Sequence, residues 1–122
     1  MQNLDQVRAA HALKEALKTD KAAVSKLPAM LLSNGLLGML AFAAEAEKPK
    51  REKMKAAVTS LTLHLAQPAA GFPELAGTAT PESLANRLAT GSALTLQRAT
   101  TEALAYFSYL KRYAPKKDKV AN

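Results

Sequence analysis

The stretch LPAMLLSNGLLGMLAFAAEA, residues Leu27–Ala46, is the most apolar part of the chain and decides its fold. The pair Asn34-Gly35 interrupts this stretch near its middle. Asn and Gly enter the left-handed region of backbone conformation most readily, so the pair predicts a helix stop followed by a turn. Because both flanking segments are apolar on every side, we expect a helical hairpin buried at the centre of the protein.

The same stretch is nearly long enough to cross a membrane, since about 18 to 20 apolar residues suffice. It contains, however, a proline, a serine, an asparagine and two glycines, and much of its apolar character comes from alanine. We therefore favour a buried hairpin over a membrane span.

The totals predict one compact domain with no disulfide and no thiolate site. The chain has 122 residues and contains no cysteine. A chain of this length can bury a core without covalent cross-links. Its first residues lack the basic start and apolar segment of a signal peptide, so we expect a cytoplasmic protein.

Strand patterns are almost absent, because the chain has no isoleucine and its commonest residues are alanine and leucine. The sequence predicts an all-α fold, a single compact bundle of about five or six helices within residues 1–113. Residues 114–122 are expected to be a basic, disordered tail, and Gln67–Ala79 a functional or mobile loop. The expected helices cover about residues 4–18, 21–33 (kinked at Pro28), 36–45, 50–66, 81–89 and 93–113.

Two of these helices have faces that can be assigned from spacing. In the first helix Ala9, Leu13 and Ala16 share one face, which we expect to be buried. The opposite face is expected in solvent and carries Arg8, His11, Lys14, Glu15 and Lys18. In the last helix the predicted outer face is a stripe of small residues with a guanidinium at each end, made of Arg98, Thr101, Ala105, Ser108 and Arg112.

Positive charge is concentrated in two clusters, and the formal net charge is +7. One cluster precedes and opens the 50–66 helix, and the other closes the chain. Such a balance favours a polyanionic partner, nucleic acid first and an anionic membrane surface second. The alternative is a charged surface that only keeps the protein soluble. The clusters are Lys48, Lys50, Arg51, Lys53 and Lys55, and then Lys111, Arg112, Lys116, Lys117 and Lys119.

Motifs for catalysis, metals and nucleotides are missing from the sequence, so we expect no enzyme activity, no cofactor and no metal. His11 and Glu15 lie one helical turn apart, but no cysteine or further nearby histidine completes a metal site. No glycine-rich phosphate loop is present. His64 stands alone beside the apolar stripe of its helix and is expected to be packed or half-exposed.

Two segments together resemble a known family. The first contains Leu27-Pro28, Asn34-Gly35-Leu36 and Leu40-Ala41-Phe42, and the second runs from Arg98 to Leu104 and continues as Tyr109-Leu110-Lys111-Arg112-Tyr113-Ala114. Both are similar to the small helical subunit of type III-B (Cmr-type) CRISPR effector complexes. Order, spacing, length and charge fit across nearly the whole chain, except that Tyr109 and Tyr113 stand where the family commonly has Trp and Phe.

The resemblance implies a non-catalytic subunit of an RNA-guided antiviral complex. Copies would stack beside the backbone subunits, contact those subunits, and help to hold guide and target RNA. It points first to Arg98, Lys111 and Arg112 as phosphate contacts, and then to Arg8. On charge alone we add Lys14, Lys18, Lys50, Arg51, Lys53 and Lys55. The alternatives are a pure protein-assembly subunit and a stand-alone basic helical nucleic-acid-binding protein.

Overall fold

The computed structural model of the chain describes residues 2–45 and 49–116, and the side chains of residues 49–51 lie outside this description. Within the described part there are six α-helices and no strand, which confirms the predicted all-α bundle. The helices are α1 (Leu4–Glu15), α2 (Lys21–Ser25), α3 (Leu27–Ala44), α4 (Pro49–Ala66), α5 (Pro81–Ala89) and α6 (Ala93–Tyr113).

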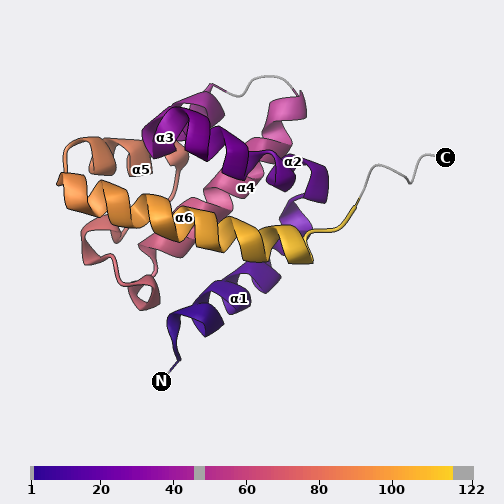
Figure 1. Cartoon of the computed structure of the whole chain (residues 1–122), viewed down its shortest axis with the longest axis horizontal. Helices are drawn as coiled ribbons and strands as arrows, with labels where there is room; N and C mark the ends of the chain where they lie inside the picture. The colour runs from indigo at the N-terminus through magenta and orange to yellow at the C-terminus, as the bar shows by residue number, and fades with distance from the viewer. Residues whose placement is uncertain (1, 46–48, 117–122) are drawn as a thin grey trace.

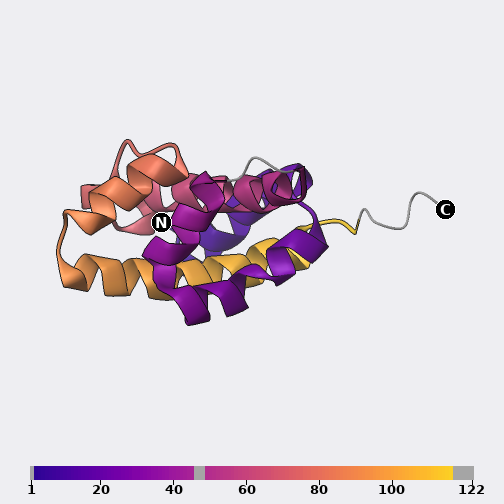
Figure 2. The ribbon, with the colours of Figure 1, turned by 90° about the horizontal axis from the view of Figure 1, so that it is seen from above.

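The long helix α6 runs across the bundle, with α1 on one side of it and α2 and α3 on the other (Figure 1). Seen from above, α6 and the first half of α3 lie in one layer, and α4 and α5 lie in the other (Figure 2). The helix α3 contacts α4, α5 and α6, so it joins the two layers. The core between them is apolar and includes Met39, Leu40, Val58, Leu61, Leu65, Leu84, Phe107 and Leu110.

The turn inside the opening stretch is present, but its conformation differs from the prediction. Gly35 has φ 76° and ψ 168°, and it breaks α3 into two halves. Asn34 has no positive φ, so the glycine alone makes the bend. This conformation lies outside the left-handed helical region and is essentially restricted to glycine, because a Cβ atom would clash with the backbone.

The expectation that this stretch is buried on all sides was wrong. Each half of α3 buries one face, and Leu32 is 73% exposed. By length and composition α3 is apolar enough to cross a membrane, yet a third of it is buried against the bundle. Pro28 does not kink a helix interior either, because it lies in the first turn of α3, where its missing N–H has no helical partner to lose.

The helix starts in the second half of the chain follow their capping residues. Thr80 caps α5 by accepting a hydrogen bond from the backbone N–H of Ser83, and Pro81 begins that helix. Ser92 caps α6 in the same way through Thr95. The segment Gln67–Ala79 packs against the bundle through two short 3-10 turns, Pro68–Ala70 and Pro73–Leu75, which bury Phe72 and Leu75.

Two contacts lie just beyond residue 113, the predicted end of the helical domain. Ala114 is buried, and the carbonyl of Pro115 accepts a hydrogen bond from the backbone N–H of Lys21 at 2.9 Å. These contacts attach the residues directly after α6 to the start of α2. The rest of the expected tail, residues 117–122, lies outside the described residues.

Candidate RNA-binding surface

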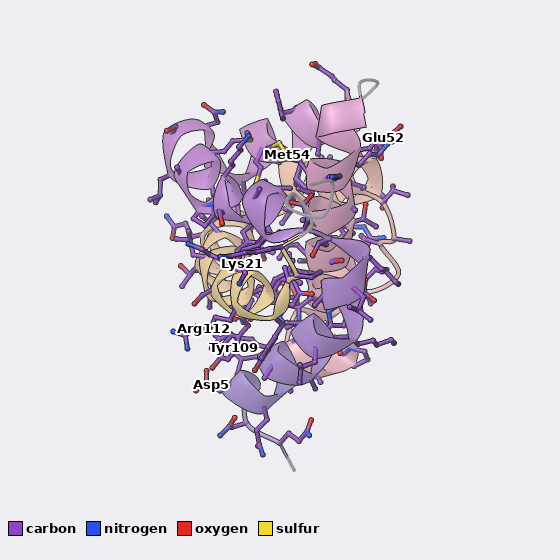
Figure 3. All side chains as sticks on the ribbon, turned by 90° about the vertical axis from the view of Figure 1, so that its right-hand side faces the viewer. Asp5, Lys21, Glu52, Met54, Tyr109 and Arg112 are labelled. Carbon is purple, nitrogen blue, oxygen red and sulfur yellow. The ribbon has the colours of Figure 1, made fainter. Side chains whose placement is uncertain are left out.

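The C-terminal end of α6 and the start of α2 form one end of the molecule. Nζ of Lys21 donates hydrogen bonds to the carbonyls of Lys111 at 2.6 Å and Arg112 at 3.4 Å. A lysine at the C-terminus of a helix is stabilising, because it meets carbonyls that have no partner within the helix. Figure 3 looks onto this end, with Lys21 and Arg112 on the same side of it.

Two further lysines are held at this end by buried carboxylates. Lys18 pairs with Glu15 at 3.1 Å, and Lys53 of α4 pairs with Asp20 at 3.1 Å. Their side chains remain 63% and 60% exposed, so each ammonium group can still meet a second anion. Hydrogen bonds from Lys18 and Ser60 lower the pKa of Glu15 despite its burial, which keeps that carboxylate charged.

Besides Arg98 and Lys55, three of the predicted phosphate contacts have no acidic partner in the part of the chain that the structure describes. These are Lys14 on α1, and Lys111 and Arg112 on α6, all of them exposed. The contacts of Lys21 with the last turn of α6 and of Lys53 with Asp20 gather positive charge from α2, α4 and α6 at one end. We call this set the basic end; it consists of Lys18, Lys21, Lys53, Lys111 and Arg112. Lys14 is not part of it, because it lines a small hollow with Gln67 and Ala69.

The other predicted contacts are not part of the basic end as the structure describes it. Lys55 lies two residues beyond Lys53 and so does not share its face of α4, and it is half-buried. The side chains of Lys50 and Arg51, and Lys48 as a whole, lie outside the described residues. Sequence reasoning missed Lys21, whose position next to the capping residue Asp20 was the available signal.

Arg98 lies at the opposite end of α6 from Arg112. A helix rises about 1.5 Å per residue, which separates the two arginines by about 21 Å along the axis. The guanidinium of Arg98 stacks over the ring of Phe72, 4.9 Å from the ring centroid, and Nη2 donates to the carbonyl of Gly71 at 3.4 Å. The structure thus separates Arg98 from Lys111 and Arg112.

Arg8 is used within the fold. Its Nε and Nη2 donate to the two carboxylate oxygens of Glu102 at 2.7 Å each, and Nη1 donates to Asp5 at 2.8 Å. The hydrogen bonds to Glu102 raise the pKa of Arg8 above its usual value. With most of its donors occupied, Arg8 ties α1 to α6 and offers little to a phosphate. The predicted faces of α1 were wrong in part, since Arg8 faces inward and Leu13 is 57% exposed, whereas Ala16 is buried as expected.

Glu102 is the centre of a buried polar network that joins α1, α4 and α6. Nε2 of the fully buried His64 donates to Glu102 at 2.9 Å, and Nδ1 of His64 accepts from Gln67 at 2.9 Å. Burial raises the pKa of Glu102, but hydrogen bonds from Arg8 and His64 outweigh it, so that the pKa lies below its usual range. This carboxylate is therefore charged and fully bonded at neutral pH.

An aromatic layer covers the network. The ring of Tyr106 stacks on His64 with centroids 4.4 Å apart, and its hydroxyl is 2.8 Å from Nδ1 of His11. Burial lowers the pKa of His11 to about 4, so at neutral pH its ring is uncharged and Nδ1 can accept from the tyrosine hydroxyl. Burial also raises the pKa of Tyr106.

These histidines and carboxylates bind one another and do not form a metal site. The part of the chain that the structure describes has no group of three histidine, cysteine or carboxylate side chains that could hold a metal ion. Every buried polar side-chain atom there has a hydrogen-bond partner. The network therefore stabilises the bundle, whereas the basic end is a part of the described surface with charge available to a partner.

Fold and surface define a small, basic, all-α protein with a cluster of cations at one end. Residues 2–116 match the family model described as CRISPR-associated protein (Cas_Cmr5), and the chain belongs to that family. It is thus a CRISPR-associated subunit of the type III-B, or Cmr-type, class, which confirms the resemblance found in the sequence. No curated protein and no solved structure matches the chain.

Proposed function

We propose that this chain is a non-catalytic subunit of a type III-B interference complex that holds guide or target RNA at its basic end. The observation that carries the proposal is the convergence of five cations at the point where α2 and α4 meet the C-terminal end of α6, namely Lys18, Lys21, Lys53, Lys111 and Arg112. Lysine and arginine bind phosphate through charge and hydrogen bonds. In a subunit of an RNA-guided complex, such a surface suits an RNA backbone.

Binding at this surface would be independent of RNA sequence. Phosphate contacts position a nucleic acid and do not read its bases. The buried Tyr106 and Phe107 offer no platform on which a base could stack. We further propose that neighbouring copies of the chain and the backbone subunits contact its other surfaces, and that the complex works in cytoplasmic antiviral defence.

The experiment is titration of a fluorescein-labelled single-stranded RNA with the purified chain at several salt concentrations. Neutralising about three to five phosphates predicts that log K falls with log salt at a slope of roughly −2 to −4. The paired substitution Lys111→Ala with Arg112→Ala should weaken binding and make the slope shallower by about one or more. A flat salt response would contradict the proposal.

The main alternative is an assembly subunit that binds only proteins and whose charge serves solubility. The same double substitution separates the two functions inside the complex. An RNA-holding subunit should still assemble after the change while target-RNA capture falls. Loss of assembly with unchanged RNA capture would favour the alternative.

A further inference from the structure

The N-terminal half of α6 carries a second surface of different character, a ridge with a groove on either side. Gln97 and Thr101 form the ridge, because both line both grooves. One groove has a volume of about 560 Å³ and follows the bend of α3 at Gly35. The other has a volume of about 450 Å³ and lies between α6, the start of α1 and the Gln67–Ala79 segment.

The walls of these grooves are largely apolar. Leu94 is 63% exposed and Leu4 is 37% exposed beside the second groove, while Leu37 and Leu96 line the first. Water contact with such side chains is unfavourable, and an exposed apolar patch of this kind is typical of a protein-interaction surface.

The charge on this surface is low and is concentrated at Arg98. The other two charged lining residues, Arg8 and Glu102, neutralise each other as an ion pair. Arg98 makes one long hydrogen bond, to the carbonyl of Gly71 at 3.4 Å, and has no ion pair among the described residues. The pKa of Glu74 is lowered mainly by a backbone hydrogen bond and by the bond that its carboxylate accepts from the Thr95 hydroxyl, and least by Arg98.

A guanidinium has five N–H donors in a planar fork, so Arg98 retains the donors that a carboxylate needs. An RNA backbone would place a row of phosphates on a surface that has one free cation and leucine walls. Leucine side chains cannot replace the water that hydrates those phosphates. A protein helix with one acidic residue on an apolar stripe matches both the positive charge of Arg98 and the apolar walls of the grooves. Helices pack by fitting ridges of side chains into grooves, and interface centres are rich in arginine and poor in lysine.

We propose that the ridge of Gln97 and Thr101, with its two grooves, binds an amphipathic helix of another protein subunit, whose carboxylate pairs with Arg98. This inference rests on the proposed role of the chain as a subunit of a larger complex. It assigns the two ends of α6 to different partners, with protein at Arg98 and RNA at Arg112.

Matched substitutions at the two ends of α6 test the assignment. Arg98→Gln and Arg112→Gln each remove one charge from the same helix, and Leu94→Asn alters an exposed groove wall without changing charge. Each variant is measured for incorporation into the reconstituted complex, for binding of the labelled RNA by the isolated chain, and for thermal unfolding as a folding control.

We expect Arg98→Gln and Leu94→Asn to lower incorporation about tenfold, with RNA affinity within about twofold of wild type. Equal loss of RNA affinity in Arg98→Gln and Arg112→Gln would overturn the inference, as would wild-type incorporation of both Arg98→Gln and Leu94→Asn. The effect of Arg112→Gln on RNA affinity tests the proposed RNA surface separately.

A photo-crosslinker placed on the ridge identifies the occupant. The substitution Gln97→p-benzoylphenylalanine in the assembled complex should crosslink to a helical peptide of another subunit that has an Asp or Glu among apolar residues at helical spacing. Exchanging that residue for arginine in combination with Arg98→Glu should then restore incorporation. Crosslinking to RNA, or failure of the exchange to restore incorporation, would overturn the proposal.

Discussion

Replacing Glu102 with alanine perturbs the buried network at its centre. The carboxylate of Glu102 accepts hydrogen bonds from Nε and Nη2 of Arg8 at 2.7 Å and from Nε2 of His64 at 2.9 Å. In the variant the Arg8 side chain, 17% exposed, keeps its charge with Asp5 as its remaining ionic partner. The fully buried Nε2 of His64 loses its acceptor.

Removing one partner of a buried ion pair costs about 3 to 5 kcal/mol, because the other charge is left without compensation. We take the lower figure, since Arg8 is partly exposed and retains Asp5, and expect the free energy of unfolding to fall by about 3 kcal/mol. The entropy of unfolding is about 2.1 cal/mol/K per residue, so the midpoint of thermal unfolding should fall by about 12 °C.

The assay is thermal and urea unfolding followed by circular dichroism. Glu82→Ala, an exposed acid in the first turn of α5, serves as control and should cost no more than about 1 kcal/mol. The double variant Arg8→Ala with Glu102→Ala should be less destabilised than the sum of the single variants, because the two residues are directly coupled. A loss below about 1 kcal/mol for Glu102→Ala would refute the structural role assigned to this network.

Three further predictions concern the bend and the aromatic layer. Gly35→Val and Gly35→Asn should each destabilise the protein by about 1 to 3 kcal/mol, because the φ and ψ of Gly35 suit glycine alone; an undisturbed Asn variant would indicate a left-handed helical turn. Tyr106→Phe removes the hydrogen bond between the tyrosine hydroxyl and His11 and should lower the free energy of urea unfolding by about 1 kcal/mol. An unchanged midpoint of urea unfolding would argue against that hydrogen bond. The pKa of His11 is about 4 in the folded protein and 6.5 in the unfolded chain, so as pH falls His11 is protonated in the unfolded chain before it is protonated in the folded protein. Stability should therefore fall as pH drops from 6.5 towards 4, and less steeply in His11→Gln; equal slopes would contradict this.

The sequence was sufficient to predict the second half of the fold. The ranges expected for the last two helices match α5 and α6, which begin directly after the capping residues Thr80 and Ser92. These signals are local, since each depends on residues a few positions apart, and local patterns can be read without knowing the tertiary structure.

The faces of α1 could not be predicted in the same way. Spacing favoured leucine and alanine on the inside, whereas Arg8 and His11 face inward because their partners, Glu102 and Tyr106, lie on α6 more than ninety residues away. One signal was available, namely the position of Glu102 between Ala99 and Ala103 on the apolar stripe of the last helix. A carboxylate there requires a buried cation or several donors.

The candidate RNA surface was predicted in part. Net charge indicated a polyanionic partner, and the exposed Lys111 and Arg112 fit that expectation. Which lysines gather at one end depends on the meeting of α2, α4 and α6, which sequence spacing does not reveal. For the same reason the sequence placed Arg98 and Arg112 on one functional stripe, although Phe72 and the grooves give Arg98 different surroundings.

The most direct test of the central claim is the salt dependence of RNA binding by the wild-type chain and by Lys111→Ala with Arg112→Ala. If the basic end holds an RNA backbone, log K falls with log salt at a slope of roughly −2 to −4, and the double variant binds more weakly with a shallower slope. Affinity that does not change with salt, or a double variant with wild-type affinity and slope, would contradict the claim.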